Sequence, residues 1–149
     1  MAKTNALPSW ITDHIKLYLS DPEKAHLFDA SATGGPKDTP TLLLTAKGRK
    51  SGKDLHFPIA YGRTGNAFVV IASKGGSRDH PQWYKNLVAN PDCIIQVGKD
   101  RYRARARSAS GTERETLWAM MSKTNPAYDR YQERASNREI PVVVFDPVT

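Results

Sequence analysis

A small hydroxyl, a cation and two glycines end an apolar run in the middle of the chain. Residues 67–72 are apolar, Ser73-Lys74-Gly75-Gly76 follow, and two adjacent aromatics, Trp83 and Tyr84, come soon after. Glycine allows a sharp turn and lets a ligand approach backbone amides closely. The hydroxyl, the ammonium and the start of the next helix supply donors. Flat aromatic rings nearby could stack on a planar group. This combination is typical of a pocket for a large anionic cofactor with an aromatic head, although an ordinary strand, turn and helix has the same composition.

A second glycine-bounded turn, residues 47–53, is strongly basic. Its cations and small residues are Lys47, Gly48, Arg49, Lys50, Ser51, Gly52 and Lys53. Amides, a hydroxyl and a guanidinium together suit a phosphate or carboxylates. The turn is one residue short of a P-loop, and Asp54 stands where Ser or Thr is needed, so nucleoside triphosphate hydrolysis is excluded. Two basic glycine turns beside successive strands favour an anion site over a solvated turn.

Tyr128 and Tyr131 are three residues apart in a segment with helical character, so they share one helical face. A phenol could donate a proton or hold a carbonyl or nitro oxygen, or the two rings could simply pack. The four histidines have no metal-ligand spacing, so we expect no metal site. Motifs for covalent catalysis and for dinucleotide binding are also missing. Any catalysis would therefore depend on a bound cofactor.

Four arginines alternate with other residues at positions 101, 103, 105 and 107, which places them on one face of a strand. They could contact an extended anionic tail or nucleic acid. We favour the solvent face of an outer strand, where charge also prevents edge pairing.

The elements that must position these residues are short strands with inserted helices. Hydrophobic periodicity and turn residues predict strands over residues 41–46, 56–61, 67–72, 94–97, 102–108 and 140–145. Helices are expected over residues 9–20, 79–89, 112–123 and 126–135, the third opened by a capping box from Thr112 to Glu115. Short links make the strands mostly antiparallel. The expected fold is mainly β with helices (α+β), a closed or partly closed β-barrel over residues 41–149 behind an N-terminal helical arm over residues 1–40.

Composition limits the class of protein. The chain has 149 residues, a net charge of +7 and one cysteine, Cys93, so an intramolecular disulfide is excluded and anionic partners are favoured. No signal peptide or membrane span is evident, which predicts a cytoplasmic protein. The helix over residues 9–20 could touch a membrane surface, but packing on the barrel is favoured. A monomer and a homodimer are both left open.

Five segments together resemble one family. They are Gly48-Arg49-Lys50-Ser51-Gly52, Ile71-Ala72-Ser73-Lys74-Gly75-Gly76, Pro81-Gln82-Trp83-Tyr84-Lys85-Asn86-Leu87, Asn90-Pro91 and Ile140-Pro141-Val142-Val143-Val144. In order and spacing they are similar to the deazaflavin-dependent nitroreductase family of mycobacteria and related actinobacteria, oxidoreductases that use coenzyme F420. The resemblance implies a split β-barrel of the flavin-reductase or FMN-binding type that binds the reduced deazaflavin.

The resemblance also implies roles for individual residues. The phosphate and the start of the polyglutamate tail would be held by Arg49, Lys50 and Ser51. The deazaflavin and its ribityl chain would be lined by Leu55, His56, Phe57, Pro58, Ile59, Ala60, Ile71, Ala72, Ser73 and Lys74. The site would be completed by Gln82, Trp83, Tyr84, Lys85 and Asn86. Tyr128 would lie on the substrate side near the hydride-donating carbon, with Tyr131 as its neighbour.

The implied reaction is hydride transfer to an electron-poor small molecule: an activated C=C of enones, unsaturated esters or lactones, a quinone, or a nitro compound. Relatives that activate nitroimidazole prodrugs carry a tyrosine where this chain has Asn125, and another tyrosine position is Ala60 here, with Tyr61 adjacent. We therefore favour reduction of an activated double bond. The alternatives are an FMN- or haem-binding split-barrel protein and a nucleic-acid-binding module.

Overall fold

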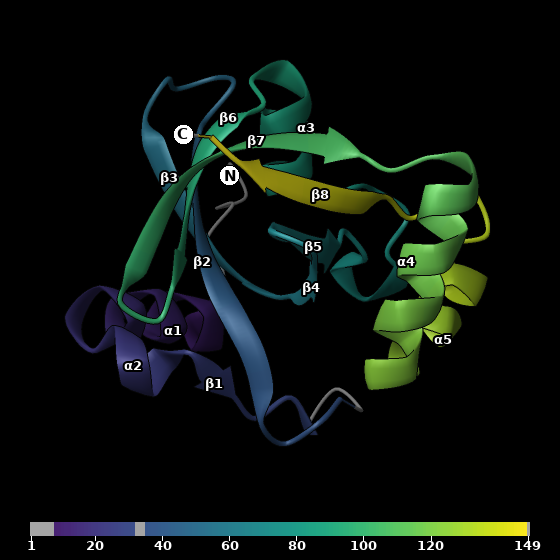
Figure 1. Ribbon diagram of the computed structural model, residues 1–149, viewed down its shortest axis with the longest axis horizontal. Coiled ribbons are helices and arrows are strands. Elements are labelled where there is room, and N and C mark those ends of the chain that lie inside the picture. Colours follow the sequence, from purple (N-terminus) through teal and green to yellow (C-terminus); the bar gives the residue numbers. More distant parts are fainter. Residues whose placement is uncertain (1–7, 32–34, 149) are drawn as a thin grey trace, which may run out of the picture.

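A strongly curved antiparallel sheet forms the body of the protein, and helices cover its ends and one side (Figure 1). The computed structural model describes residues 8–31 and 35–148. The strands are β1 (Leu27–Phe28), β2 (Thr39–Lys47), β3 (Asp54–Ala60), β4 (Gly62–Thr64), β5 (Ala67–Ile71), β6 (Asp92–Val97), β7 (Asp100–Ser108) and β8 (Val142–Pro147). The helices are α1 (Ser9–Ser20), α2 (Pro22–Ala25), α3 (Gln82–Ala89), α4 (Gly111–Thr124) and α5 (Ala127–Arg134), with a 3₁₀ turn, η2, at Lys74–Gly76.

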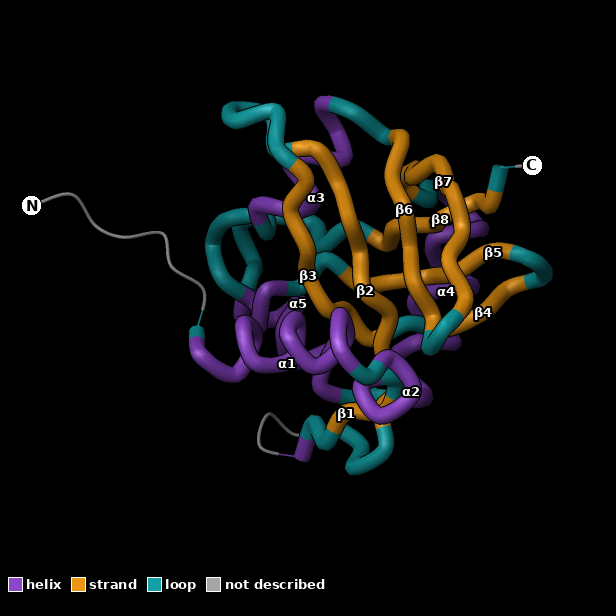
Figure 2. Tube along the Cα trace, turned by 90° about the vertical axis from the view of Figure 1, so that its left-hand side faces the viewer, coloured by secondary structure: helices purple, strands orange, loops and turns teal. Residues whose placement is uncertain are grey.

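The sheet has the order β1-β2-β6-β7-β8-β5-β4, and β3 pairs with β2 beside this path. Figure 2 shows β3, β2, β6 and β7 side by side, with α1 and α2 across one end of these strands. Pro58 lies opposite Leu43 in β3, which has β2 as its one partner strand within the described residues. A proline is tolerated at such an edge because its missing N–H removes no second ladder bond.

Two apolar layers explain why β5 is a continuous apolar run. Phe68 and Val70 belong to a core cluster with residues of β2, β6, β7 and α3. The alternate residues Val69 and Ile71 belong to a second cluster with α4 and α5. Successive strand side chains point to opposite faces, so a strand covered on both faces has no polar position.

The described part of the N-terminal segment packs on β2. Tyr18 is fully buried against Leu43, and its hydroxyl donates to the Thr41 carbonyl at 2.8 Å and accepts from Gly98 N at 2.9 Å. The ring of His26 lies 2.7 Å from the Tyr61 hydroxyl through Nε2. In the described ranges, no helix is long and apolar enough to cross a membrane.

Most predicted elements are present, with differences at their ends. The short strands β1 and β4 were not predicted, and α3 begins at Gln82, after Pro81, instead of at residue 79. The predicted capping box of α4 is wrong. The N-cap is Ser110, two residues before Thr112, and the Ser110 side chain makes no capping hydrogen bond.

Candidate functional site

The turn after β5 has the backbone geometry of an anion-binding nest. Ser73 is right-handed helical, whereas Lys74 (φ 45°) and Gly75 (φ 63°) lie in the left-handed region. A right-handed residue followed by a left-handed one directs successive N–H groups into one concavity. Within the described residues, no hydrogen bond occupies the backbone N–H of Ser73, Lys74 or Gly75. We call the segment 73–76 the nest turn.

Arg138 holds the nest turn from its carbonyl side. Its guanidinium donates to the carbonyls of Ala72 (3.4 Å), Ser73 (2.7 Å) and Ser77 (2.9 Å), and it lies 3.0 Å from His80 Nδ1. One side chain thus satisfies three carbonyls around the turn. Partial burial lowers the pKa of this guanidinium. Burial, and after it the nearby Arg138 cation, lowers the pKa of His80.

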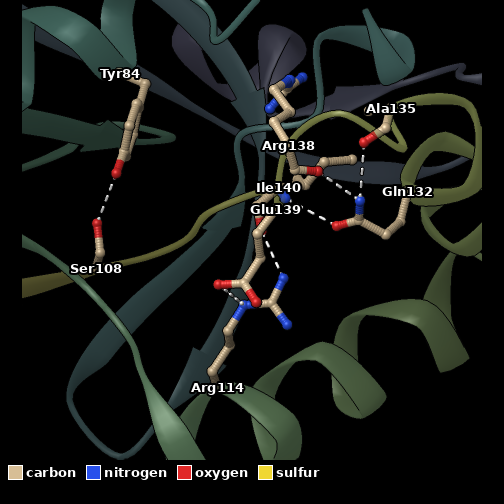
Figure 3. A network of polar contacts seen from close by, with 8 residues as sticks. All are labelled: Tyr84, Ser108, Arg114, Gln132, Ala135, Arg138, Glu139 and Ile140. Carbon is tan, nitrogen blue, oxygen red and sulfur yellow. Dashed lines mark hydrogen bonds and ion pairs between the residues drawn. The ribbon is translucent and has the colours of Figure 1, made fainter. Parts of the chain in front are cut away.

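The segment that carries Arg138 is itself fixed by α5 (Figure 3). The Gln132 side chain donates to the carbonyls of Ala135 (3.3 Å) and Arg138 (2.8 Å) and accepts from Ile140 N at 2.8 Å. Helix α5 also touches the nest turn directly, because Arg134 donates to the Gly75 carbonyl at 3.0 Å. The nest turn is therefore clamped by α5 and by the residues that follow it.

The basic turn after β2 is tied to α3. Arg49 donates from its backbone N (3.1 Å) and its Nη1 (2.8 Å) to Asn86 Oδ1, and from Nη2 to Gln82 Oε1 at 2.7 Å. Asn86 is buried, whereas Lys50 and Ser51 are exposed, and Ser51 Oγ accepts from Lys53 N. Arg49 thus joins the turn to the helix, and the Lys50 ammonium remains exposed to solvent.

Strand β3 runs from the basic turn towards a small cavity. Leu55 is exposed at its start and His56 contacts Thr45, whereas Pro58 and Ile59 are buried and Phe57 is partly buried. Five residue steps of a strand separate Leu55 from Ala60, about 16 Å. The strand therefore connects two separate parts of the predicted site.

The predicted aromatic residues of α3 lie mainly in the core. Trp83 is 7% exposed, and its ring centroid is 6.4 Å from that of Phe57. The Tyr84 hydroxyl lies 3.0 Å from Ser108 Oγ (Figure 3), and its ring is 4.9 Å from His80. Lys85 is partly buried, whereas Ile71 and Ala72 are buried beneath the nest turn. The Trp83 ring is thus a packing residue here and not an open stacking surface.

Ala60 and Tyr128 line one cavity of about 70 Å³, together with Tyr61, Met121 and Asn125 among others. Tyr128 is 7% exposed, and its ring is 6.3 Å from that of Tyr131. Burial raises the pKa of Tyr128 to about 12, against a smaller opposite effect of its hydrogen bond with Asn125. The phenol is therefore protonated at neutral pH and available as a donor.

Several residues that shape the site could not be found from spacing. Arg138, Arg134 and Gln132 act through backbone carbonyls, and no periodic pattern marks them. The arginines of β7 are exposed, as the solvent-face interpretation predicts, but the predicted outer strand is wrong, because β7 lies between β6 and β8. Arg105 pairs with Asp92, and Arg107 pairs with Glu113 and Asp146. Within the described residues, no cluster of His, Cys, Asp or Glu could hold a metal ion.

Comparison with known proteins gives the family. The profile described as F420H(2)-dependent quinone reductase matches residues 22–147. The Mycobacterium tuberculosis protein Rv3178 is 42% identical over 114 residues, which are 76% of this chain and 95% of that protein.

Solved structures agree with this result. A structure described as an F420-H2 dependent reductase, FDR-A, has a TM-score of 0.66 and 36% identity, covering 72% of this chain and 94% of that one. A chain solved as a domain-swapped dimer has a TM-score of 0.69 and 30% identity, covering 93% and 98%. The expected split β-barrel is confirmed, as is the deazaflavin-dependent resemblance. The chain belongs to the F420H(2)-dependent quinone reductase family, whose members are oxidoreductases with reduced coenzyme F420 as cofactor.

Proposed function

We propose that the nest turn and the basic turn together hold the phosphate and carboxylates of coenzyme F420, and that the hydride acceptor lies in the cavity beside Tyr128. The observation that carries this proposal is the nest turn. Three unpartnered N–H groups converge there next to the exposed ammonium of Lys74. Such a concavity favours an anion.

The residues fit a polyanionic cofactor at one end and a planar group at the other. Lys50, Ser51 and Lys53 are exposed on the basic turn, and a net charge of +7 favours anion capture. Beyond them, the strand residues from Leu55 to Ala60 and the ends of β5 and α3 would line the ring. Arg49 would mainly hold the basic turn against α3, because its guanidinium already binds Gln82 and Asn86.

When bound, reduced F420 supplies a hydride. The chain's own task is then to orient the acceptor and to neutralise the negative charge that develops on the acceptor oxygen. The Tyr128 phenol is the donor that we assign to that oxygen, and it or solvent supplies the proton. Tyr131 packs edge-on against it and limits its rotation.

The acceptor class is an electron-poor C=C conjugated to a carbonyl: a quinone, an enone, or an unsaturated ester or lactone. The family description supports quinones. Small side chains at Asn125 and Ala60 leave room for a ring edge in a cavity of about 70 Å³. Nitro compounds are a weaker candidate because a tyrosine of the nitroimidazole-activating relatives is replaced by Asn125.

Titration of the purified protein with F420, followed by deazaflavin fluorescence, tests the proposal. Saturable binding that weakens in Lys50→Ala and Lys74→Ala, but not in Lys123→Ala on α4, would support it. Absence of binding to the wild type would contradict it, and FMN and haem would then be the ligands to test.

A homodimer is the assembly that we propose. A relative that covers 93% of this chain was solved as a domain-swapped dimer. Light scattering after size exclusion separates a particle of twice 16.6 kDa from a monomer, and a mass of one chain at micromolar concentration would contradict the proposal.

A further inference from the structure

The cavity beside Tyr128 is built partly by the segment that precedes the barrel. Four of its lining residues come from β2 and from the residues just before it, namely Pro36, Asp38, Thr39 and Pro40. The other lining residues are Ala60, Tyr61, Met121, Thr124, Asn125 and Tyr128. Among these ten, Asp38 carries the one formal charge. The charge at this opening is therefore negative, in contrast to the basic turn at the other end of β3.

Hydrogen bonds fix the segment that presents Asp38. The Thr39 hydroxyl donates to the Pro36 carbonyl at 2.9 Å, and Ala30 N donates to the same carbonyl at 3.0 Å. Thr39 is buried and pairs with Phe28 of β1. The carboxylate is thus carried by an anchored backbone, and the exposed Asp38 lies where the cavity meets solvent.

Neighbouring cations do not neutralise the charge of Asp38. Lys37 is next to Asp38 in the chain but lies outside the cavity lining, and it interacts with the Asp29 carboxylate, whose pKa it helps to lower. No residue of α4 or α5 that lines the cavity carries a positive charge. An anionic group beside the reacting ring would therefore meet an aspartate and find no cation among the lining residues.

We propose that Asp38 is a specificity-determining residue that disfavours acceptors with a negative charge next to the reacting ring. This inference rests on the proposed function, because it places the acceptor in this cavity. A neutral quinone and a sulfonated quinone of similar outline would then differ in kcat/KM by more than their intrinsic reactivities require. Coulomb repulsion between exposed unit charges at close range in water corresponds to about a fivefold effect.

The test compares 2-methyl-1,4-naphthoquinone with 1,4-naphthoquinone-2-sulfonate as acceptors for the F420-loaded enzyme. In Asp38→Asn we expect kcat/KM for the sulfonate to rise about fivefold relative to the neutral quinone, and less at high salt. Asp100→Asn, an exposed carboxylate of the β6–β7 hairpin, removes the same charge outside the cavity and is expected to leave the ratio unchanged. Taking the ratio between variants cancels the different redox potentials of the two quinones.

A second readout needs no turnover. Naphthalene-2-sulfonate has a similar ring outline but accepts no hydride, and its own fluorescence gives its Kd on protein saturated with oxidised F420. That Kd is expected to fall about fivefold in Asp38→Asn and to stay unchanged in Asp100→Asn. If Asp38→Asn changed neither the kcat/KM ratio of the two quinones nor the Kd of naphthalene-2-sulfonate, while F420 still bound, the proposed role of Asp38 would be overturned. The proposed function would then still stand. Failure of the wild type to bind F420 would overturn the proposed function, and this inference with it.

Discussion

The Nη2 atom of Arg138 donates a 2.7 Å hydrogen bond to the carbonyl oxygen of Ser73, although the two residues are 65 positions apart. The contact is possible because β5 and β8 are paired, with Ile71 opposite Val142. The turn that leaves β5 and the segment that enters β8 therefore meet at one edge of the sheet. Arg138 thus controls where the Ser73 and Lys74 N–H groups point without itself lying on their side of the turn.

Replacement of Arg138 is expected to loosen the nest turn. Arg138→Ala leaves the carbonyls of Ala72, Ser73 and Ser77 without this donor, which costs about 1–3 kcal/mol for any that stays buried. We expect F420 affinity to fall about tenfold and hydrogen exchange to accelerate in residues 73–77. Arg130→Ala, which changes an exposed arginine of α5, is the control. Equal F420 affinity in both variants would exclude Arg138 as a positioning residue.

Alanine substitutions at Gly76 and Gly75 form a matched pair that tests the contact between the nest turn and α5. A Cβ on Gly76 (φ 80°) would lie 2.6 Å from the Tyr131 carbonyl oxygen, whereas one on Gly75 (φ 63°) would meet nothing within 4 Å. Gly75→Ala is expected to cost about 1 kcal/mol, the penalty of a left-handed alanine. Gly76→Ala adds a backbone collision and should cost clearly more. Chemical denaturation of both variants measures the difference, and equal losses would show that α5 moves away freely.

The fold was predictable where local patterns and burial agree. Strand β5 is apolar throughout because both faces are covered, and Gly65-Asn66 marks its hairpin with β4. Pro58 correctly indicated an edge strand. The prediction for the start of α4 was wrong: Thr112 and Glu115 have capping-box spacing, but the chain enters the helix at Ser110, whose side chain makes no capping hydrogen bond. Capping depends on the path of the incoming chain, which the spacing does not contain.

The site was predictable in part for a similar reason. Glycines and cations mark both anion-binding turns, so these could be located from composition. The orientation of the Trp83 ring could not, because its burial depends on packing of α3 against Phe57 of β3. Arg138 was missed because its partners are backbone carbonyls far away in the sequence. Asp38 was missed because the cavity exists only once residues 36–40 lie opposite Tyr128.

Lys74 combines a charge with an unfavourable backbone angle, and the two can be separated. Its φ of 45° costs a non-glycine residue about 1–2 kcal/mol. Lys74→Gly removes the charge and the strain, so it should be at least as stable as the wild type but bind F420 about fivefold more weakly. Lys74→Ala keeps the strain and should bind equally weakly without the gain in stability. Thermal unfolding and F420 titration of both variants check this. If Lys74→Gly bound F420 with wild-type affinity, the Lys74 ammonium would not be part of the binding site.

Stability should fall on the alkaline side in two stages. Burial raises the pKa of Cys93 from 9.0 to about 12 and that of Tyr18 from 10.0 to about 12. The unfolded chain loses these protons first, so the folded state binds more protons and stability decreases as pH rises. The Cys93 thiol contributes between pH 9 and 12, and the phenols of Tyr18 and Tyr128, whose pKa is also raised to about 12, contribute between pH 10 and 12. Urea unfolding at several pH values should show that Cys93→Ala removes the loss between pH 9 and 10; an unchanged profile would contradict it.

Tyr128→Phe tests the donor beside the acceptor. The variant keeps the packing ring but loses the hydroxyl, so kcat/KM for a quinone should fall about a hundredfold, as for the loss of one oxyanion donor, while F420 affinity changes little. Because the pKa of Tyr128 is about 12, its phenol stays protonated up to roughly pH 10, and the wild-type rate should show no loss from this group below that pH.

Stopped-flow oxidation of bound reduced F420 separates hydride transfer from product release. Tyr102→Phe, a tyrosine of β7 outside the cavity lining, is the control. A wild-type rate in Tyr128→Phe would assign the proton to solvent and leave charge stabilisation to backbone amides.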